Sequence, residues 1–170
     1  LMLELHCHPF GDFGPQLRPG QGRATLFAER DRQAVRCTRD LDGELKAARE
    51  VLERCPALAG GADWDWLLDD LEQALVALEQ LHALGDAVVL DWPAGKPIAL
   101  TREAQVAQMR ATIRQRGDWL TIDGGLTLED GRVLAMQELL DRVAAAKGRY
   151  VPLGEGEFLV LSQALRRRLE

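Results

Sequence analysis

The alternation of apolar and polar residues at the start of the chain predicts strands separated by a loop. Residues 1–8 alternate in this way, as expected for a half-buried strand. Residues 10–23 are rich in Gly and Pro and predict a long loop. Residues 24–31 and 33–40 then predict two strands that form a hairpin around Arg32.

Helical spacing of leucine and alanine follows in the first half. A helix is predicted over residues 41–55, with Asp40 or Asp42 at its N-cap. A second helix is predicted over residues 63–85, capped by Asp63. Its predicted apolar stripe consists of Leu67, Leu71, Leu75, Leu78 and Leu81.

Strand-like patterns dominate the middle of the chain. The apolar run 87–93 predicts a short buried strand, and residues 106–115 alternate with a period of two. Residues 118–132 are interpreted as two short strands around a turn at residues 123–125, where glycines permit positive φ.

The last part returns to mixed patterns. A helix is predicted over residues 133–148, and strands at 149–153 and 158–162 flank a Gly-Glu-Gly turn. Ser162 is the predicted cap of a final helix. The expected fold class is α+β, with antiparallel strands, hairpins and about four helices. We expect two lobes, because the charge and the pattern change between residues 85 and 97. These lobes are residues 1–90, an α+β lobe, and residues 91–170, a strand-hairpin and helix lobe.

Composition narrows the class of protein. The chain has 170 residues, of which 46% are hydrophobic and 28% charged. No apolar run approaches the roughly 18 residues that a membrane span requires, and residues 1–10 do not resemble a signal peptide. The three cysteines are an odd number without a CxxC motif, which argues against a disulfide framework. We therefore predict a cytoplasmic protein that does not contact membranes.

Charge is distributed unevenly along the chain. The net charge is −6, and residues 1–85 account for it with nine Lys/Arg against 15 Asp/Glu. Such an acidic chain is a poor candidate for tight autonomous nucleic-acid binding, although one basic face can still contribute. The candidate nucleic-acid contacts are Arg110, Arg114, Arg149, Arg166, Arg167 and Arg168. The alternative for the last three is the favourable placement of cations at a helix C-terminus, which needs no ligand.

Other candidate chemistry is weaker. His6 and His8 lie on one side of a predicted strand, but a zinc site needs three or four ligands, and no further ligand pair has recognisable spacing. The glycine-containing stretches lack the GxxxxGK[ST] pattern of a phosphate loop. Trp64 and Trp66 cannot share a helical face, so one of them is a candidate for docking a neighbouring domain. We predict no catalytic residue, no metal and no cofactor.

The last third of the chain resembles a known protein family. Residues 118–170 are similar to a segment that precedes the ATPase core in bacterial Swi/Snf-related helicases of the DEAD/DEAH-box superfamily, and residues 18–44 fit the upstream region more loosely. The matching positions are Asp118-Trp119, Leu139-Leu140, Gly148 to Val151, Leu153, the Gly-Glu-Gly turn, Phe158-Leu159, Leu165, Arg166 and Leu169.

The resemblance implies an accessory region of a DNA-dependent ATPase. The sequence itself contains no Walker A loop, no DEAD/DEAH box and no arginine-finger motif, so ATP binding by the parent protein would depend on residues beyond Glu170. The expected partners are a downstream ATPase core in the same polypeptide and duplex DNA. Two alternatives remain. One is an interaction module that recruits the helicase to the transcription machinery, and the other is a small metal-dependent hydrolase using His6 and His8.

Overall fold

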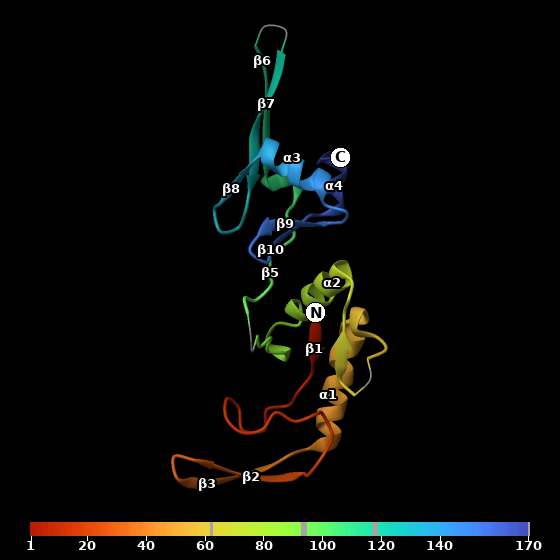
Figure 1. Ribbon diagram of the computed structural model, residues 1–170, viewed down its shortest axis with the longest axis vertical. Coiled ribbons are helices and arrows are strands. Elements are labelled where there is room, and N and C mark those ends of the chain that lie inside the picture. Colours follow the sequence, from red (N-terminus) through yellow and green to blue (C-terminus); the bar gives the residue numbers. More distant parts are fainter. Residues whose placement is uncertain (62, 93–94, 117–118, 170) are drawn as a thin grey trace. The chain divides into compact units, whose positions relative to one another are not determined.

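The chain folds into two compact units of mixed α and β structure. The computed structural model describes residues 1–61, 63–92, 95–116 and 119–169; for residues 113, 114, 116 and 119–122 it describes the backbone. The N-terminal unit comprises Leu1–Leu90 and the C-terminal unit Asp91–Glu170 (Figure 1). Small, mostly antiparallel sheets and four α-helices in the described residues confirm the predicted α+β class.

The first strand of the N-terminal unit pairs with a distant segment. Strand β1 (Met2–Glu4) lies antiparallel to β4 (Asp65–Leu67), and Leu3 is opposite Trp66. The half-buried side chains of Leu1, Leu3 and Leu5 pack against the core of this unit, as the alternating pattern predicted.

The predicted hairpin of the N-terminal unit is confirmed. Strand β2 (Thr25–Arg30) pairs antiparallel with β3 (Gln33–Thr38) along their whole length. The connecting residues Asp31 and Arg32 have φ angles of 54° and 62°. Two consecutive positive φ angles are typical of a type I′ turn, whose twist matches that of the flanking strands.

Carboxylate caps begin both helices of the N-terminal unit. Helix α1 (Leu41–Arg54) starts after Asp40, whose side chain accepts a hydrogen bond of 3.0 Å from the backbone N–H of Gly43. Of the two predicted caps, Asp40 is therefore the N-cap, and Asp42 lies in the first turn of the helix. Helix α2 (Leu71–His82) starts after Asp70, which accepts from the N–H of Gln73 at 3.2 Å. Each cap satisfies one N–H group that the helix itself leaves unbonded.

The prediction of a helix from residue 63 is wrong at its beginning. Asp63 and Trp64 have φ angles of 53° and 67°, and the next three residues form β4. The side chains of Leu67 and Leu71 are 71% and 56% exposed, so the first part of the predicted apolar stripe does not face the core. Pairing with β1 and burial of Trp66 outweigh helical spacing here, because spacing is a local signal that tertiary contacts override.

The core of the N-terminal unit lies between α1, α2 and β4. A short 3₁₀ turn, η1 (Pro56–Leu58), follows α1, and another, η2 (Gly85–Ala87), follows α2. The predicted strand over residues 87–93 is also wrong, since the described residues 88–92 have no strand pairing. The buried cluster consists of Cys55, Leu58, Trp66, Leu68, Ala74, Ala77, Leu81 and Leu84.

The second predicted hairpin lies in the C-terminal unit and is also confirmed. Strand β9 (Tyr150–Gly154) pairs antiparallel with β10 (Glu157–Val160), and β10 pairs in parallel with β5 (Ala99–Leu100). Helix α4 (Gln163–Leu169) follows. The Ser162 hydroxyl accepts a hydrogen bond of 3.2 Å from the N–H of Leu165, as predicted for this cap.

The other sheet of the C-terminal unit corrects the predicted turn at residues 123–125. The 3₁₀ turn η3 (Val106–Gln108) leads into β6 (Met109–Arg116), which pairs with β7 (Trp119–Thr127). Strand β7 continues straight through its two glycines and then pairs with β8 (Val133–Ala135).

The two glycines are needed because neighbouring backbones approach β7 closely. A Cβ atom on Gly124 would lie 2.0 Å from the carbonyl oxygen of Arg110, and one on Gly125 would lie 2.3 Å from that of Leu134. Gly124 does have a positive φ, 144°, as its sequence context suggested, but inside a strand. Glycines within strands often mark such close approaches.

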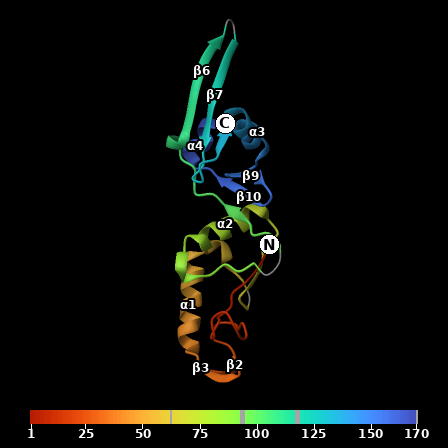
Figure 2. The same ribbon diagram turned by 90° about the vertical axis from the view of Figure 1, so that its left-hand side faces the viewer.

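Helix α3 (Met136–Ala145) begins later than predicted, because its first predicted residues form β8. It covers β7 and β8 and packs against α4 (Figure 2). The core of the C-terminal unit consists of Ala104, Leu126, Leu128, Leu139, Val143, Val151, Leu159, Leu161 and Leu165.

Replacing Gly124 by Ala is expected to destabilise the C-terminal unit by about 3 kcal/mol or more. The added methyl group overlaps the Arg110 carbonyl, which the sheet holds in place, and it also imposes an unfavourable φ. The measurement is urea denaturation followed by circular dichroism.

The matched control is Gly131→Ala. Gly131 also has a positive φ, 86°, but an added Cβ would have no heavy atom within 4 Å. Only the φ cost of about 1 kcal/mol remains there. Equal effects of the two substitutions would contradict the proposed role of the close approach.

Candidate nucleic-acid interface

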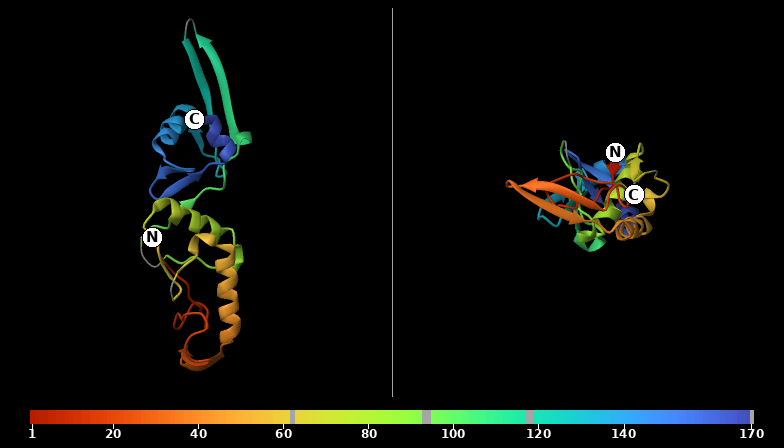
Figure 3. Two further views of the ribbon diagram at one scale, coloured as in Figure 1. Left: turned by 90° about the vertical axis from the view of Figure 1, so that its right-hand side faces the viewer. Right: turned by 90° about the horizontal axis from the view of Figure 1, so that it is seen from below.

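Strands β6 and β7 form a two-stranded ribbon that leaves the rest of the C-terminal unit. They pair from Met109 opposite Leu126 to Arg116 opposite Trp119, whereas β8 pairs only with residues 125–127. Residues 111–116 and 119–124 therefore form a ribbon without a third strand; it extends beyond α3 and the β9–β10 hairpin (Figures 1 and 3).

Arginine recurs along one strand of this ribbon. Arg110 is exposed and lies opposite Gly125, and Arg114 and Arg116 occupy register positions opposite Thr121 and Trp119. Residues that are an even number apart in a strand fall on the same face of the sheet. The side chains of Arg114 and Arg116 lie outside the described part. The same face of the ribbon also carries an acidic residue, Asp123, which is exposed and lies opposite Thr112.

Helix α4 carries the second group of predicted contacts. Its buried residue Leu165 belongs to the core, and Leu169 packs on that core together with Val106 and Met109 at the base of the ribbon. The views from two sides agree that α4 lies beside this base (Figures 2 and 3). Arg167 and Arg168 are exposed, whereas Arg166 is half-buried. The cations lie in the last turn, where they also complement the helix dipole.

Arg149 is half-buried and already paired within the C-terminal unit. Its guanidinium forms an ion pair of 2.9 Å with Glu103 and lies 5.5 Å from the ring centre of Tyr150. This ion pair offsets the charge that a phosphate contact would use, so the structure sets Arg149 apart from the other predicted contacts.

Acidic partners neutralise several other cations of the C-terminal unit. These ion pairs are Lys96–Glu155, Arg102–Glu129, Arg132–Asp130, Arg132–Glu157 and Arg142–Glu138. Among the residues described in this unit, Arg110, Lys147, Arg167 and Arg168 have no carboxylate within ion-pair distance. Positive charge without an internal partner therefore occurs on the ribbon and on α4, as well as at the end of α3.

The two tryptophans proposed for docking differ in their environment. Trp66 is only 7% exposed, and its indole N–H donates a hydrogen bond of 2.6 Å to the carbonyl of Leu58. It is a core residue, because strand β4 turns it inward. Trp64 is half-buried and packs against the same core. Next to them, Met2 and Leu67 form an exposed cross-strand pair, 68% and 71% exposed.

The histidine strand does not form a metal centre in the described residues. His6 lies 3.5 Å from a carboxylate oxygen of Glu4, and Cys7 forms a β-bridge with Leu17. No cluster of three or more His, Cys, Asp or Glu side chains in the described part has an arrangement that could hold a metal ion. Burial, reinforced by Glu44, raises the pKa of the Cys7 thiol, which disfavours the thiolate that metals bind.

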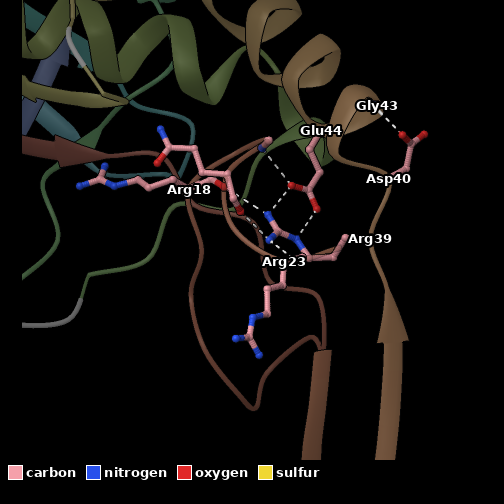
Figure 4. Close-up of polar contacts among 8 residues, drawn as sticks. Arg18, Arg23, Arg39, Asp40, Gly43 and Glu44 are labelled. Atoms are coloured by element: carbon pink, nitrogen blue, oxygen red, sulfur yellow. Dashed lines mark hydrogen bonds and ion pairs between the residues drawn. The ribbon is translucent and has the colours of Figure 1, made fainter. Parts of the chain in front are cut away.

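The most extensively bonded polar group of the N-terminal unit is Arg39, which is only 6% exposed. Its guanidinium donates to both carboxylate oxygens of Glu44, at 2.8 and 2.5 Å. It also donates to backbone carbonyls of the 10–23 loop, those of Arg18, Gln21 and Arg23. The side chains of Arg18 and Arg23 point away from this cluster (Figure 4).

This cluster connects three parts of the chain. Glu44, on the first turn of α1, also accepts a hydrogen bond of 3.1 Å from the N–H of Gly20. The loop, the end of β3 and the start of α1 therefore share one ion pair. Because the donors of Arg39 are used internally, we interpret the cluster as structural. The hydrogen bonds from Arg39 lower the pKa of the Glu44 carboxyl below its usual value.

A second arginine connects the loop to β4. Arg18 binds both carboxylate oxygens of Asp65 and donates a hydrogen bond of 3.2 Å to the Trp64 carbonyl. This contact stabilises the left-handed segment before β4.

Comparison with known proteins found no matching family model, no matching curated protein and no matching solved structure. Within the described ranges, none of the helices has the length and apolar character that crossing a membrane demands.

Replacing Glu44 by Gln is expected to destabilise the N-terminal unit by about 3 kcal/mol at neutral pH, because it leaves the buried Arg39 without its counter-ion. A carboxyl with a lowered pKa in the folded state stabilises the fold above its unfolded pKa, and this stabilisation is lost as pH falls through the folded pKa. The difference between wild type and variant should therefore shrink below about pH 4. Urea denaturation over a pH series measures it.

The matched control is Glu138→Gln. Glu138 pairs with Arg142 on the surface of α3 at 2.8 Å, an exposed i,i+4 pair. Such pairs contribute about 0.5 kcal/mol or less. A pH-independent difference for the Glu44 variant would contradict the assigned role of this ion pair.

Proposed function

We propose that this chain is a non-catalytic accessory region of a bacterial Swi/Snf-related, DNA-dependent ATPase. In this role it positions the ATPase lobes or guides duplex DNA toward them. The resemblance of residues 118–170 motivates the proposal. The observation that supports it is the arrangement of α4, which is fixed to its unit through buried Leu165 while Arg167 and Arg168 remain exposed.

A helix fixed in this way has a mechanical consequence. Ser162 caps α4 and Leu165 is fully buried, so the helix direction is set by the core of the C-terminal unit. A polypeptide that continues from such a helix is oriented by it, whereas a flexible Gly/Ser linker would transmit no orientation. Contact of the exposed arginines with DNA would be weak and dependent on salt, because phosphate contacts release counterions.

The proposal is tested in the full-length protein. The reading frame after Glu170 should encode a phosphate-binding loop of the GxGKT type. Substituting Arg166, Arg167 and Arg168 by Ala should lower the DNA-stimulated ATPase rate at least about threefold at subsaturating DNA, because phosphate contacts are lost. The control is Arg142→Ala, which removes an arginine that is paired with Glu138.

Different outcomes bear on different parts of the proposal. Unchanged stimulation in the triple variant rules out DNA guiding through α4, and the role of this helix is then limited to positioning the lobes. A stop codon directly after the final helix, or nucleotide hydrolysis by the isolated 170 residues, overturns the accessory role altogether.

A second candidate function is recruitment of the helicase to the transcription machinery. The exposed pair of Met2 and Leu67, together with Leu71 at 56% exposure, places apolar surface beside the tryptophans. Exposed apolar clusters often mark protein contacts. The Leu67→Ser, Leu71→Ser double variant should then weaken binding to purified bacterial RNA polymerase by about tenfold or more in surface plasmon resonance.

The control for this experiment is Val133→Ser in the other unit, where a single apolar side chain is 65% exposed. Absence of wild-type binding, or equal loss in both variants, rules out this function.

A further inference from the structure

We propose that the β6–β7 ribbon is a two-stranded arm that binds duplex DNA in a groove, through the phosphate backbone and without sequence preference. This inference deepens the DNA-guiding part of the proposed function and rests on it. It assigns the main contact to residues 110–116 of β6 rather than to α4.

The shape of the ribbon supports this assignment. The major groove of B-DNA is about 12 Å wide and admits a two-stranded antiparallel β-ribbon. Two paired strands lie about 4.8 Å apart, and a strand of this length extends for roughly 25 Å. Since β8 pairs only with residues 125–127, no third strand broadens the ribbon over residues 111–116 and 119–124.

Small residues, Ala111, Gly124 and Gly125, lie at the base of the ribbon. Ala111 lies opposite Gly124, Arg110 opposite Gly125, and Thr112 opposite Asp123. Residues 110–112 and Gly124 are exposed. Ala111 is exposed and adds little bulk beyond the backbone, which leaves room for a ligand to approach the strand there. A ribbon built to pack against a protein core would instead carry large apolar residues at these positions.

The charge along β6 supports a phosphate ligand. Arginine occupies positions 110, 114 and 116, which share a face by strand alternation, and Arg110 has no carboxylate partner in the part of the chain that the structure describes. Arginine binds phosphate oxygens through several N–H donors at once. Contacts of this kind position a protein on DNA but do not read its sequence.

An acidic peptide is the competing ligand for the same arginines. Such a peptide would bind by adding a strand to the free edge of β6, which requires an accessible row of main-chain groups. Charged side chains on an edge strand are a common means of preventing this kind of addition. The arginines along β6 therefore favour a duplex over a peptide.

The test uses the whole 170-residue chain and a fluorescein-labelled duplex of about 20 base pairs, with binding measured by fluorescence anisotropy at several salt concentrations. Substituting Arg110, Arg114 and Arg116 by Ala should weaken binding at least tenfold at low salt. It should also reduce the slope of log K against log salt concentration by about 2 to 3, because each lost phosphate contact contributes close to 1.

The chain offers a matched control in its other hairpin. Substituting Arg30, Arg32 and Arg36 by Ala removes the same charge from β2 and β3 and the turn between them. That hairpin belongs to the acidic N-terminal unit, where Arg30 already lies 3.8 Å from Asp31. This control should change the affinity less than twofold. Circular dichroism verifies that both variants fold.

The remaining outcomes separate the arm from the proposed function. A polyglutamate peptide serves as the second probe, and loss of peptide binding with unchanged DNA binding overturns the inference. If the ribbon variant binds DNA like wild type while an Arg167→Ala, Arg168→Ala variant does not, the arm is overturned but the proposed function stands. If the wild-type chain does not bind the duplex even at low salt, the arm is overturned as well.

Discussion

The close approach of three strands at Gly124 and Gly125 is the constraint on which the C-terminal unit depends. A Cβ atom on Gly124 would overlap the Arg110 carbonyl of β6, and one on Gly125 would overlap the Leu134 carbonyl of β8. This contact lets β7 pair with β6 on one side and with β8 on the other. Because β8 leads directly into α3, it also determines where Leu139 and Val143 enter the core. The glycine pair thus marks the boundary between the packed part of the unit and the free ribbon.

Local chemistry explains which elements could be predicted from sequence. The hairpin around Arg32, the cap at Asp40, one of two predicted candidates, and the cap at Ser162 depend on nearby residues, and all three agree with the structure. The helix predicted from residue 63 failed because β4 finds its partner, β1, more than sixty residues away. The glycine turn failed for the same kind of reason. The glycines were recognised as special, but the backbones that require them, at Arg110 and Leu134, are not local in sequence.

The candidate site was predictable only in part. Arginines at alternate positions of β6 are visible in the sequence, and the structure adds that this strand belongs to a ribbon without a third strand. The burial of Trp66 was not predictable, since it depends on the Leu58 carbonyl. Arg39 gives no signal either. It follows a strand that carries exposed Arg36, and only the returning carbonyls of the 10–23 loop make it a buried residue.

Arg39 and the exposed arginines of the C-terminal unit play different roles, and this difference bears on how DNA would be held. In the N-terminal unit Arg39 is consumed by internal bonds, whereas in the C-terminal unit Arg110, Arg167 and Arg168 keep their charge toward solvent. The ribbon and α4 share one core, because Met109 and Leu169 pack on the same cluster around Leu165. A duplex held by the proposed arm would therefore keep a fixed position relative to α4. In the proposed function, force applied through a polypeptide continuing from that helix would act on the DNA through this packed core.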